Sequence, residues 1–394
     1  MKKQGLFIKR LLGAGLAIIL AAAAMNLPGS TLDVSAATHY AAGIDVSKYQ
    51  GPINWQQVKD DGVQFVMVRV GSTKKGIDEQ FVANITGANA VGLRTGVYIY
   101  SYATTVEAAQ AEANMVLNAI APYTVSFPVA IDVEDACIKP LSPQDQATVA
   151  TAFCDVIASA GYYPMVYSSR NWFNSRMGNI KYDKWVAMYA ENLEYSGDYT
   201  MWQSSSHGQV KGIGYRVDVD HLYKDLYSYI IPEGFTTRGD KTYLYKNYRK
   251  QLGWIEYNGE RYVCEPSDNG AVQTGWFTDS LGKHYLDPAQ GGKLLTGLQV
   301  IDGDAYLLDG NGIPYSGWSG TWPELYYFGA DGKMVKGKLT VDGVECTFGK
   351  DGRLTAPEGF DPVANAEAQA AAKAAAQPAE AAAQEAPAQE APAQ

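Results

Sequence analysis

The sequence predicts an α/β fold followed by an all-β one: a modified TIM-like (β/α) barrel with missing late helices, then a solenoid of β-hairpin repeats. Apolar strand segments alternate with helical stretches over residues 40–231, a pattern typical of parallel sheets, and about eight strands are typical of a closed barrel. The last two strand segments leave no room for full helices between them. After Pro232, glycine–aromatic steps recur about every 20 residues, which indicates a repeat array.

Residues 1–36 have the features of a secretory signal peptide. A basic head precedes an apolar run, Leu11 to Ala24, that is too short to span a bilayer comfortably. Val34-Ser35-Ala36 then supplies a small-residue cleavage site. The alternative is an uncleaved membrane anchor. We favour cleavage and expect a secreted protein.

The barrel strands are expected where short apolar runs rich in β-branched and aromatic residues occur. These runs are Gly43–Val46, Phe65–Val70, Thr95–Tyr102, Phe127–Glu134, Tyr163–Ser168, Trp185–Ala190, Thr200–Ser204 and Val217–Asp220. Helices are expected between the earlier strands, at Ile53–Gly62, Asp78–Gly92, Thr105–Ile120 and Ser142–Gly161. The last of these begins with a serine cap and a proline in its first turn.

Two acidic residues stand next to each other on one face of an apolar strand. Side chains alternate faces along a strand, so Asp132 and Glu134 project together while Ile131 and Val133 project to the other side. Carboxyl groups that lie close together repel, and their pKa values separate. One can then hold a proton while the other stays charged, as the cleavage of a glycosidic bond requires.

Two further acids, Asp45 and Asp218, also lie at predicted strand ends. In barrel enzymes the active site forms where the strands end, so all four acids are expected to meet there. A lone acid at a strand end is more often a helix cap or a solvated loop residue, but four together favour a site. Strand-end aromatic residues can stack on sugars or simply pack the barrel, and both interpretations stay open for Tyr100, Tyr167, Tyr189 and Trp202.

Three segments in order resemble glycoside hydrolase family 25, the lysozymes called muramidases. They are Gly43-Ile44-Asp45-Val46-Ser47, Ile131-Asp132-Val133-Glu134, and Trp202-Gln203 leading to Val217-Asp218-Val219-Asp220. The resemblance covers about residues 40–230. It implies a modified barrel and cleavage of the β-1,4 bond between N-acetylmuramic acid and N-acetylglucosamine in peptidoglycan, with retention at the anomeric carbon.

The same resemblance implies roles for single residues. Glu134 matches the general acid/base, Asp132 its partner carboxylate, and Asp45 and Asp218 the flanking acids, with Gln203 among the substrate-binding residues. Asp132 either attacks the sugar itself or steadies the 2-acetamido group of the substrate, which then attacks instead. One departure is Asp220, where the family often has Asn. We expect it to add a charge near the site.

The repeat region is expected over residues 240–357. Its glycine steps are Gly253-Trp254, Gly275-Trp276, Gly297-Leu298, Gly317-Trp318 and Gly337-Lys338. Between them lie dipeptides that favour tight type I′ turns, namely Asn258-Gly259, Asp302-Gly303, Asn311-Gly312, Asp331-Gly332, Asp342-Gly343 and Asp351-Gly352. Residues 362–394, rich in Ala, Gln, Glu and Pro, are expected to form a disordered tail.

The repeats resemble the choline-binding and glucan-binding repeats of exported surface proteins. The candidate ligand-binding rings are Trp254, Tyr262, Trp276, Tyr285, Tyr306, Trp318 and Tyr327. Such rings can enclose a quaternary ammonium group, or they can only hold the hairpins together. Leu298 and Lys338 interrupt the tryptophan pattern. A cell-wall polymer, either choline-bearing teichoic acid or glucan, is the expected partner.

Composition excludes several other functions. A net charge of −10 without a basic stripe argues against a nucleic-acid partner. The four histidines form no zinc motif, and no nucleophile elbow or phosphate-binding loop occurs, so no metal or cofactor is expected. The four cysteines are either free thiols or include a Cys137–Cys154 pair.

We therefore predict a secreted, cell-wall-associated, monomeric peptidoglycan hydrolase. Two alternatives are a non-catalytic adhesive protein and a glycosidase acting on a chitin-like polymer.

Overall fold

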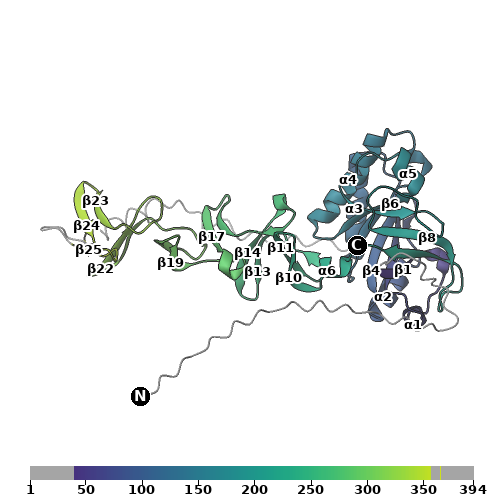
Figure 1. Ribbon diagram of the computed structural model, residues 1–394, viewed down its shortest axis with the longest axis horizontal. Coiled ribbons are helices and arrows are strands. Elements are labelled where there is room, and N and C mark those ends of the chain that lie inside the picture. Colours follow the sequence, from purple (N-terminus) through teal and green to yellow (C-terminus); the bar gives the residue numbers. More distant parts are fainter. Residues whose placement is uncertain (1–39, 356–363, 365–394) are drawn as a thin grey trace, which may run out of the picture.

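The computed structural model describes residues 40–355 and Ala364. The predicted signal peptide and, apart from Ala364, the predicted tail lie outside the described residues. Within the part that is described, no helix is long and apolar enough to cross a membrane. The barrel lies at one end of the molecule, and the hairpins follow one another away from it (Figure 1).

Eight strands close the barrel, with β1 paired to both β9 and β2. They are β1 (Ala41–Val46), β2 (Phe65–Ser72), β4 (Arg94–Tyr100), β5 (Val129–Asp132), β6 (Pro164–Ser169), β7 (Asp183–Ala187), β8 (Met201–Gly208) and β9 (Val217–Leu222). The short strand β3 (Gly76–Ile77) is added at the end of β2. The predicted modified barrel is confirmed.

The last strand runs against its neighbours. Each pair from β1–β2 through β7–β8 is parallel, but β9 pairs antiparallel with both β8 and β1. A parallel crossover needs about a dozen residues or more, and only residues 209–216 separate β8 from β9. The connection is too short for a helix, as predicted, and the final strand is therefore reversed, which the sequence did not predict.

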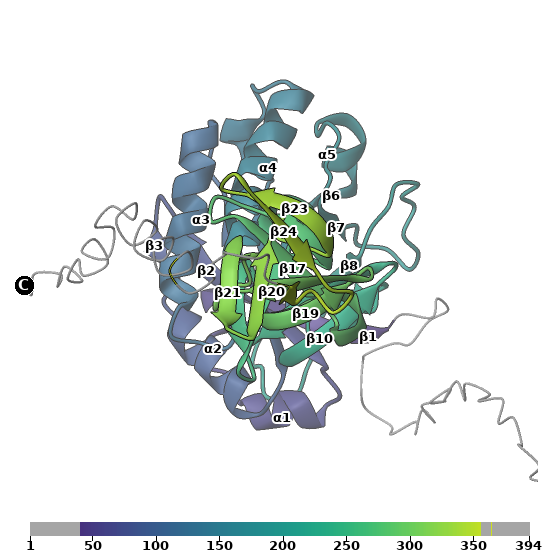
Figure 2. The same cartoon turned by 90° about the vertical axis from the view of Figure 1, so that its left-hand side faces the viewer.

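Four helices lie at the predicted places, and two short ones, at residues 170–175 and 226–229, were not predicted. The helices are α1 (Trp55–Asp60), α2 (Phe81–Ala90), α3 (Val106–Ile120), α4 (Pro143–Ser159), α5 (Arg170–Ser175) and α6 (Leu226–Tyr229). Short 3-10 turns lie at Lys48–Gln50, Ala136–Ile138, Pro266–Asp268 and Pro288–Gln290. Ser142 caps α4 by accepting a hydrogen bond from the Asp145 amide, as its sequence predicts. Helices α2, α3 and α4 lie along the outside of the barrel (Figure 2).

Strand alternation divides the core into two layers. Outward side chains pack under the helices, among them Ile44, Val66, Val97, Ile131 and Val166. Inward apolar side chains fill the barrel, among them Phe65, Met67, Ala130, Met165 and Trp185. Gly43 makes room for this filling, because a side-chain carbon there would lie 2.5 Å from the Phe65 ring. The inward-facing polar residues lie toward the other end of the barrel from this apolar filling.

Beyond the barrel, antiparallel hairpins repeat. Their strands are β10 (Glu233–Arg238) with β11 (Lys241–Lys246), β13 (Gly253–Tyr257) with β14 (Glu260–Glu265), β16 (Gly275–Thr278) with β17 (Lys283–Asp287), β19 (Gly297–Ile301) with β20 (Asp304–Leu308), β21 (Gly317–Thr321) with β22 (Glu324–Phe328), and β23 (Gly337–Val341) with β24 (Val344–Phe348). Short strands β12 (Arg249–Lys250), β15 (Ala271–Val272), β18 (Lys293–Leu294) and β25 (Leu354–Thr355) add to their edges. The predicted hairpin solenoid is confirmed.

Each predicted glycine step opens a hairpin, since residues 253, 275, 297, 317 and 337 are first residues of strands. The array itself begins earlier than residue 240, with β10. Three of the six turn dipeptides, Asn258-Gly259, Asp302-Gly303 and Asp342-Gly343, have positive φ at both positions, as type I′ turns require.

At the other three dipeptides only the glycine has a positive φ, which corrects the expectation of type I′ turns there. Asn311-Gly312 and Asp331-Gly332 lie between successive hairpins, and Asp351-Gly352 lies between the paired strands β24 and β25. In the Asn311-Gly312 connection, Asp309 Oδ1 accepts hydrogen bonds from the amides of Asn311 and Ile313, at 2.8 and 2.9 Å. An aspartate three residues before the glycine therefore shapes this turn through its own side chain.

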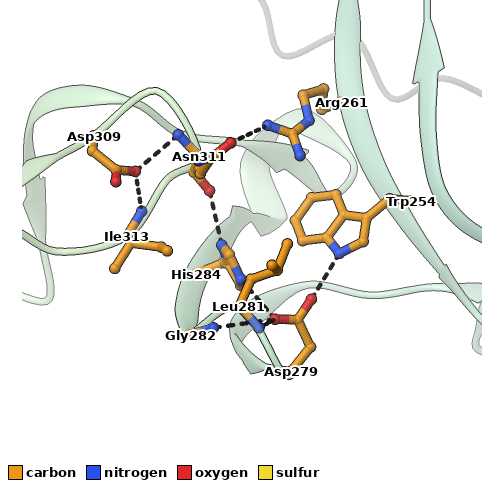
Figure 3. Close-up of polar contacts among 9 residues, drawn as sticks. All are labelled: Trp254, Arg261, Asp279, Leu281, Gly282, His284, Asp309, Asn311 and Ile313. Atoms are coloured by element: carbon orange, nitrogen blue, oxygen red, sulfur yellow. Dashed lines mark hydrogen bonds and ion pairs between the residues drawn. The ribbon is translucent and has the colours of Figure 1, made fainter. Parts of the chain in front are cut away.

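Polar contacts also tie successive hairpins together (Figure 3). Asp279, between β16 and β17, accepts a hydrogen bond of 2.7 Å from the Trp254 indole of the preceding hairpin. The buried ring of His284 lies 3.1 Å from Asp279 Oδ1 and 2.8 Å from the carbonyl oxygen of Asn311. Arg261 donates to the Asn311 side chain at 3.3 Å. Three consecutive repeats thus share one network.

The four cysteines are free. Cys154, Cys264 and Cys346 are buried, and Cys137 is half-buried. The Cys137–Cys154 pair that the sequence left open is therefore not formed.

Candidate active site

A cleft of about 630 Å³ opens at the rim where the parallel barrel strands end. Of the residues predicted for the site, those that line it are Asp45, Asp132, Glu134, Asp218, Tyr100, Tyr167, Tyr189 and Gln203. All four predicted acids therefore face one hollow. Within the described residues, no group of three or more His, Cys, Asp or Glu side chains is arranged to hold a metal ion.

Strand register brings the flanking acids together. Asp45 near the end of β1 lies directly opposite Asp218 near the start of β9. Asp218 reaches this rim because β9 is antiparallel, so its beginning lies beside the ends of the other strands. The reversal of β9 is thus the physical reason why Asp218 lies at the rim, where its place at a predicted strand end led us to expect it.

Asp132 is the last residue of β5, between Tyr100 of β4 and Tyr167 of β6. Glu134 follows two residues later, outside the strand, and faces the same cleft. Ile131 and Val133 pack into the outer core, as alternation requires. Asp132 is buried and its Oδ1 has no hydrogen-bond partner, whereas Glu134 is exposed at the mouth.

Burial and mutual repulsion favour the protonated forms of this pair. Burial, followed by repulsion from Glu134, raises the pKa of Asp132 well above its ordinary value. Desolvation by the cleft walls also raises the pKa of Glu134, and repulsion from Asp218 adds to this rise. The positive charge of Arg69 lowers the pKa of both groups and so opposes these effects. The cleft therefore favours a proton on Glu134 at its mouth more than water does.

Arg69 was not found from the sequence. Its guanidinium lies 5.2 Å from the centre of the Tyr100 ring and lines the cleft. A usable signal existed, because Arg69 is the one charged residue in the apolar run 65–70 and shares the inward parity of Phe65 and Met67. Tyr49 and Tyr215, whose rings are exposed at the mouth, were also missed, and loop positions such as theirs carry no strand pattern.

Gln203 orients Asp45 through a chain of hydrogen bonds. Its Nε2 donates to Asp45 Oδ2 at 2.6 Å, and its Oε1 accepts from the hydroxyls of Tyr167 at 2.9 Å and Tyr189 at 3.1 Å. Burial, with repulsion from Asp218, raises the pKa of Asp45 well above its ordinary value, and the hydrogen bond from Gln203 partly offsets this. Two tyrosines therefore hold the amide that positions the carboxyl group.

Asp220 lies one layer deeper than Asp218 and is fully buried. The Trp185 indole donates to Asp220 Oδ1 at 2.8 Å. Burial and repulsion from Asp45 raise the pKa of Asp220 well above its ordinary value, which favours the neutral acid. This shift acts against the additional charge that the sequence led us to expect at Asp220. Asp218, not Asp220, lines the cleft.

Asp218 is only partly buried. That burial raises its pKa to about 6, against the opposing influence of Arg216 and His207. The Arg216 guanidinium lies 2.9 Å from the His207 ring nitrogen, so these two side chains form one exposed basic group beside the acid.

Trp202 does not line the cleft, which corrects its prediction as a substrate-binding residue. Neighbouring residues on a strand face opposite sides, and Gln203 takes the inward position. The Trp202 ring packs outside against His221 and Tyr223, with ring centres 5.6 and 6.5 Å apart. Its indole donates to the Met188 carbonyl oxygen at 2.8 Å.

Comparison with known proteins agrees with this geometry. The sequence profile of the glycosyl hydrolases family 25 matches residues 44–213. The N,O-diacetylmuramidase of Arthroderma benhamiae is 30% identical over 169 residues, which cover 41% of this chain and 70% of that protein. The chain belongs to glycosyl hydrolase family 25.

Other family 25 relatives match over part of their length. The autolytic lysozyme of Clostridium acetobutylicum is 28% identical over 186 residues, covering 46% of this chain and 55% of that protein. The modular autolysin LytC from Streptococcus pneumoniae, solved with a synthetic peptidoglycan ligand, is 32% identical with a TM-score of 0.43, and the match covers 46% of each chain. This family 25 chain thus spans about half the length of those two proteins.

The aromatic residues predicted to bind a repeat ligand lie where hairpins meet. Tyr262 and Trp318 are buried, at 9% and 6% exposure, so their rings mainly pack. Trp254 is held by Asp279 and packs against the His284 ring with centres 5.0 Å apart.

Trp276, Tyr285 and Tyr306 form a half-open cluster from two successive hairpins. The Trp276 ring centre lies 5.0 Å from Tyr285 and 5.1 Å from Tyr306. The Lys283 ammonium lies 4.2 Å from the Trp276 ring centre. Tyr327 meets Trp318 at 5.0 Å in the equivalent place further along. Both interpretations of these rings, packing and ligand contact, therefore have a structural basis at Trp276.

Proposed function

We propose that this family 25 glycoside hydrolase cleaves the β-1,4 bond between N-acetylmuramic acid and N-acetylglucosamine in peptidoglycan, with retention. The observation that carries the proposal is the pair Asp132 and Glu134 in one cleft, one buried and one at its mouth. The relatives named as a lysozyme and a muramidase support this substrate.

Glu134 is the proposed general acid. Its raised pKa favours the protonated form that an acid needs, and its place at the mouth lets it reach the oxygen between two sugar rings. After donating its proton to the leaving sugar, the Glu134 carboxylate takes a proton from the water that attacks the anomeric carbon. The same residue therefore serves both steps.

Asp132 is the proposed partner of the substrate's 2-acetamido group. Its buried Oδ1 has no hydrogen-bond partner, and such orphaned acceptors are rare in folded proteins. An acetamido N–H supplies the missing donor, while the acetamido oxygen attacks the anomeric carbon as Glu134 protonates the leaving oxygen. Two successive inversions then give net retention. A glycosyl adduct trapped on Asp132 and seen by mass spectrometry would contradict this role.

The test of the activity is to mix the purified chain with peptidoglycan and, separately, with chitin, and to measure new reducing ends. We expect release from peptidoglycan, and we expect Glu134→Gln to lower the rate at least about a hundredfold, the usual effect of losing a general acid. Glu107→Gln, an exposed change at the start of α3, is the matched control and should leave the rate unchanged.

Each alternative has its own outcome in this assay. Chitin cleaved faster than peptidoglycan would favour the chitin-like substrate. Binding to cell walls with no reducing ends from either polymer would favour the non-catalytic adhesive. A near-normal rate in Glu134→Gln would remove Glu134 from the role of acid.

We further propose that the hairpins hold the enzyme on a cell-wall polymer, either choline-bearing or a glucan. The support is the Trp276 ring, whose face already accepts the Lys283 ammonium, as a ring that binds cations would. Lys283→Met should free that face and strengthen retention on immobilised choline, whereas Trp276→Ala should weaken it. Retention on dextran instead of choline would select the glucan.

Secretion and a monomeric state complete the proposal. The N-terminal segment supports export, and N-terminal sequencing of the exported protein should begin at Ala37. Light scattering during gel filtration should give the mass of a single chain.

A further inference from the structure

A second cavity, of about 970 Å³, lies between the base of the barrel and the first hairpins. Pro164 and Asp183, the first residues of β6 and β7, line it from the barrel side. The acid-lined cleft lies at the other ends of the parallel strands, so the two hollows are at opposite ends of the barrel. We call this second hollow the junction cavity.

The walls of the junction cavity are held by direct contacts between barrel and hairpins. The Lys250 amide in β12 donates to the Gly161 carbonyl oxygen at 2.8 Å. A side-chain carbon on Gly161 would lie only 2.3 Å from the Lys250 carbonyl oxygen, so glycine permits the close approach. The Arg249 guanidinium lies 5.7 Å from the centre of the Tyr162 ring.

The junction cavity is lined by four basic and two acidic side chains in a protein whose net charge is −10. The two acids are already paired: Asp155 with Lys181 and Asp183 with Lys224, both at 2.8 Å. Among the described residues, the ion pairs include neither Arg238 nor Lys250, which line the same hollow. Two positive charges are therefore left facing this cavity without an acidic partner.

Arg238 is held by tyrosines instead of by an acid. Its guanidinium lies 4.3 Å from the centre of the Tyr229 ring and 5.5 Å from that of Tyr245, and it donates to the Tyr245 hydroxyl at 2.6 Å. Neutral partners of this kind fix the guanidinium in place and leave its charge uncompensated.

Lys250 is likewise fixed by a neutral group. Its ammonium donates to the Asn269 side chain at 2.6 Å and lies 5.6 Å from the centre of the Tyr243 ring. Burial, followed by repulsion from Arg238, lowers the pKa of Lys250 to about 8. A bound anion would relieve both the desolvation and the repulsion that hold these two cations.

We propose that the junction cavity binds a phosphate group carried on a polyol or sugar chain. Arginine and lysine together are suited to phosphate oxygens, since guanidinium and ammonium groups donate several charge-assisted hydrogen bonds. The volume exceeds what one phosphate fills and lies at the upper end of small-molecule pockets. Tyr163, Tyr182 and Tyr229 supply ring surfaces along which a polyol or sugar can lie. The proposal does not depend on the reaction assigned to the acid cleft.

The test is calorimetric titration of the full chain with sn-glycerol 3-phosphate, inorganic phosphate, a poly(glycerol phosphate) chain and glycerol. We expect saturable binding of the two glycerol phosphates, weaker binding of inorganic phosphate and none of glycerol. Lys250→Gln should weaken the binding at least about tenfold, the scale of one charge-assisted hydrogen bond. Lys246→Gln, an equal charge change at an exposed position of β11 outside the cavity, should stay within about twofold.

A second variant keeps the test decisive if Lys250→Gln is unstable. Lys250→Arg retains the charge and should retain most of the binding. The proposal is overturned by no saturable binding of any phosphate probe, or by equal loss in the Lys246→Gln and Lys250→Gln proteins. Inorganic phosphate binding as tightly as the glycerol phosphates would overturn the polyol part. Reducing-end release from peptidoglycan by Lys250→Gln should be unchanged, so a failure here is distinct from a failure of the hydrolase proposal.

Discussion

The chemistry of each acidic residue at the acid cleft depends on how deeply its side chain is buried as well as on its residue type. Asp218 and Asp220 are two residues apart and face the same way, yet one lines the cleft and the other is fully buried. The spacing in the sequence predicted their shared direction. It could not predict that Trp185 and Asp45 would enclose Asp220, because those partners come from distant strands.

The buried acid should make stability depend on pH. Burial raises the pKa of Asp220 in the folded protein. The contribution of Asp220 to the free energy of unfolding is therefore fully present below its pKa in the unfolded chain, and it is lost as pH rises through its pKa in the folded protein. Asp220→Asn should therefore gain stability relative to the natural chain as pH rises from 5 to 8, by on the order of 1 kcal/mol. Urea unfolding at the two pH values measures this, and a difference that shrinks with pH would contradict it.

Arg69 should set the pH range of activity. Its charge lowers the pKa of both Asp132 and Glu134, so Arg69→Met should let both pKa values rise. Both limbs of the pH profile of kcat/KM should then move toward higher pH. Lys211→Met, which removes a cation paired with Asp61 away from the cleft, is the control and should leave the profile in place.

For the strands and hairpins, the periodicity of the sequence predicted the features that depend on local residue patterns. Alternation in β5 put Asp132 and Glu134 on one side, and the glycine steps marked where each hairpin begins. The direction of β9 was not predicted, because it depends on how the barrel closes after a short connection. The distinction between hairpin turns and connections was also missed, since Asn-Gly and Asp-Gly pairs suit both.

The network around Asp279 should be a stabilising point of the hairpin array. Partial burial acts against the charged form, but the Trp254 indole, the Leu281 amide and His284 outweigh it and lower the pKa of Asp279 to about 2. Asp279→Ala should destabilise the repeats by about 1.5–3 kcal/mol, the range for hydrogen bonds to a charged group. Urea unfolding followed by tryptophan fluorescence measures this.

The control for that prediction is Glu256→Ala, an exposed change on β13, which should leave the midpoint nearly unchanged. The lowered pKa of Asp279 also fixes the sign with pH: its contribution is present above the unfolded pKa and is lost as pH falls toward about 2. An equal effect of Asp279→Ala at pH 7 and pH 2 would contradict the account.

At the scale of the whole molecule, the two hollows lie at opposite ends of one barrel. The acid cleft is open at the rim where the parallel strands end, and the junction cavity lies where the hairpins begin. Sequence patterns identified the acidic residues of the acid cleft, because these residues lie at the ends of apolar strands. Sequence patterns did not identify the junction cavity. Its residues come from separate turns and strands, and they meet only when the barrel and the hairpins pack together.

The central claim is that Asp132 and Glu134 act together on one glycosidic bond with net retention. Proton NMR during the first minutes of peptidoglycan cleavage measures it most directly, because it shows which anomer of the new reducing end appears before mutarotation. The account predicts that the β-anomer appears first. Release of the α-anomer first would show inversion and contradict it.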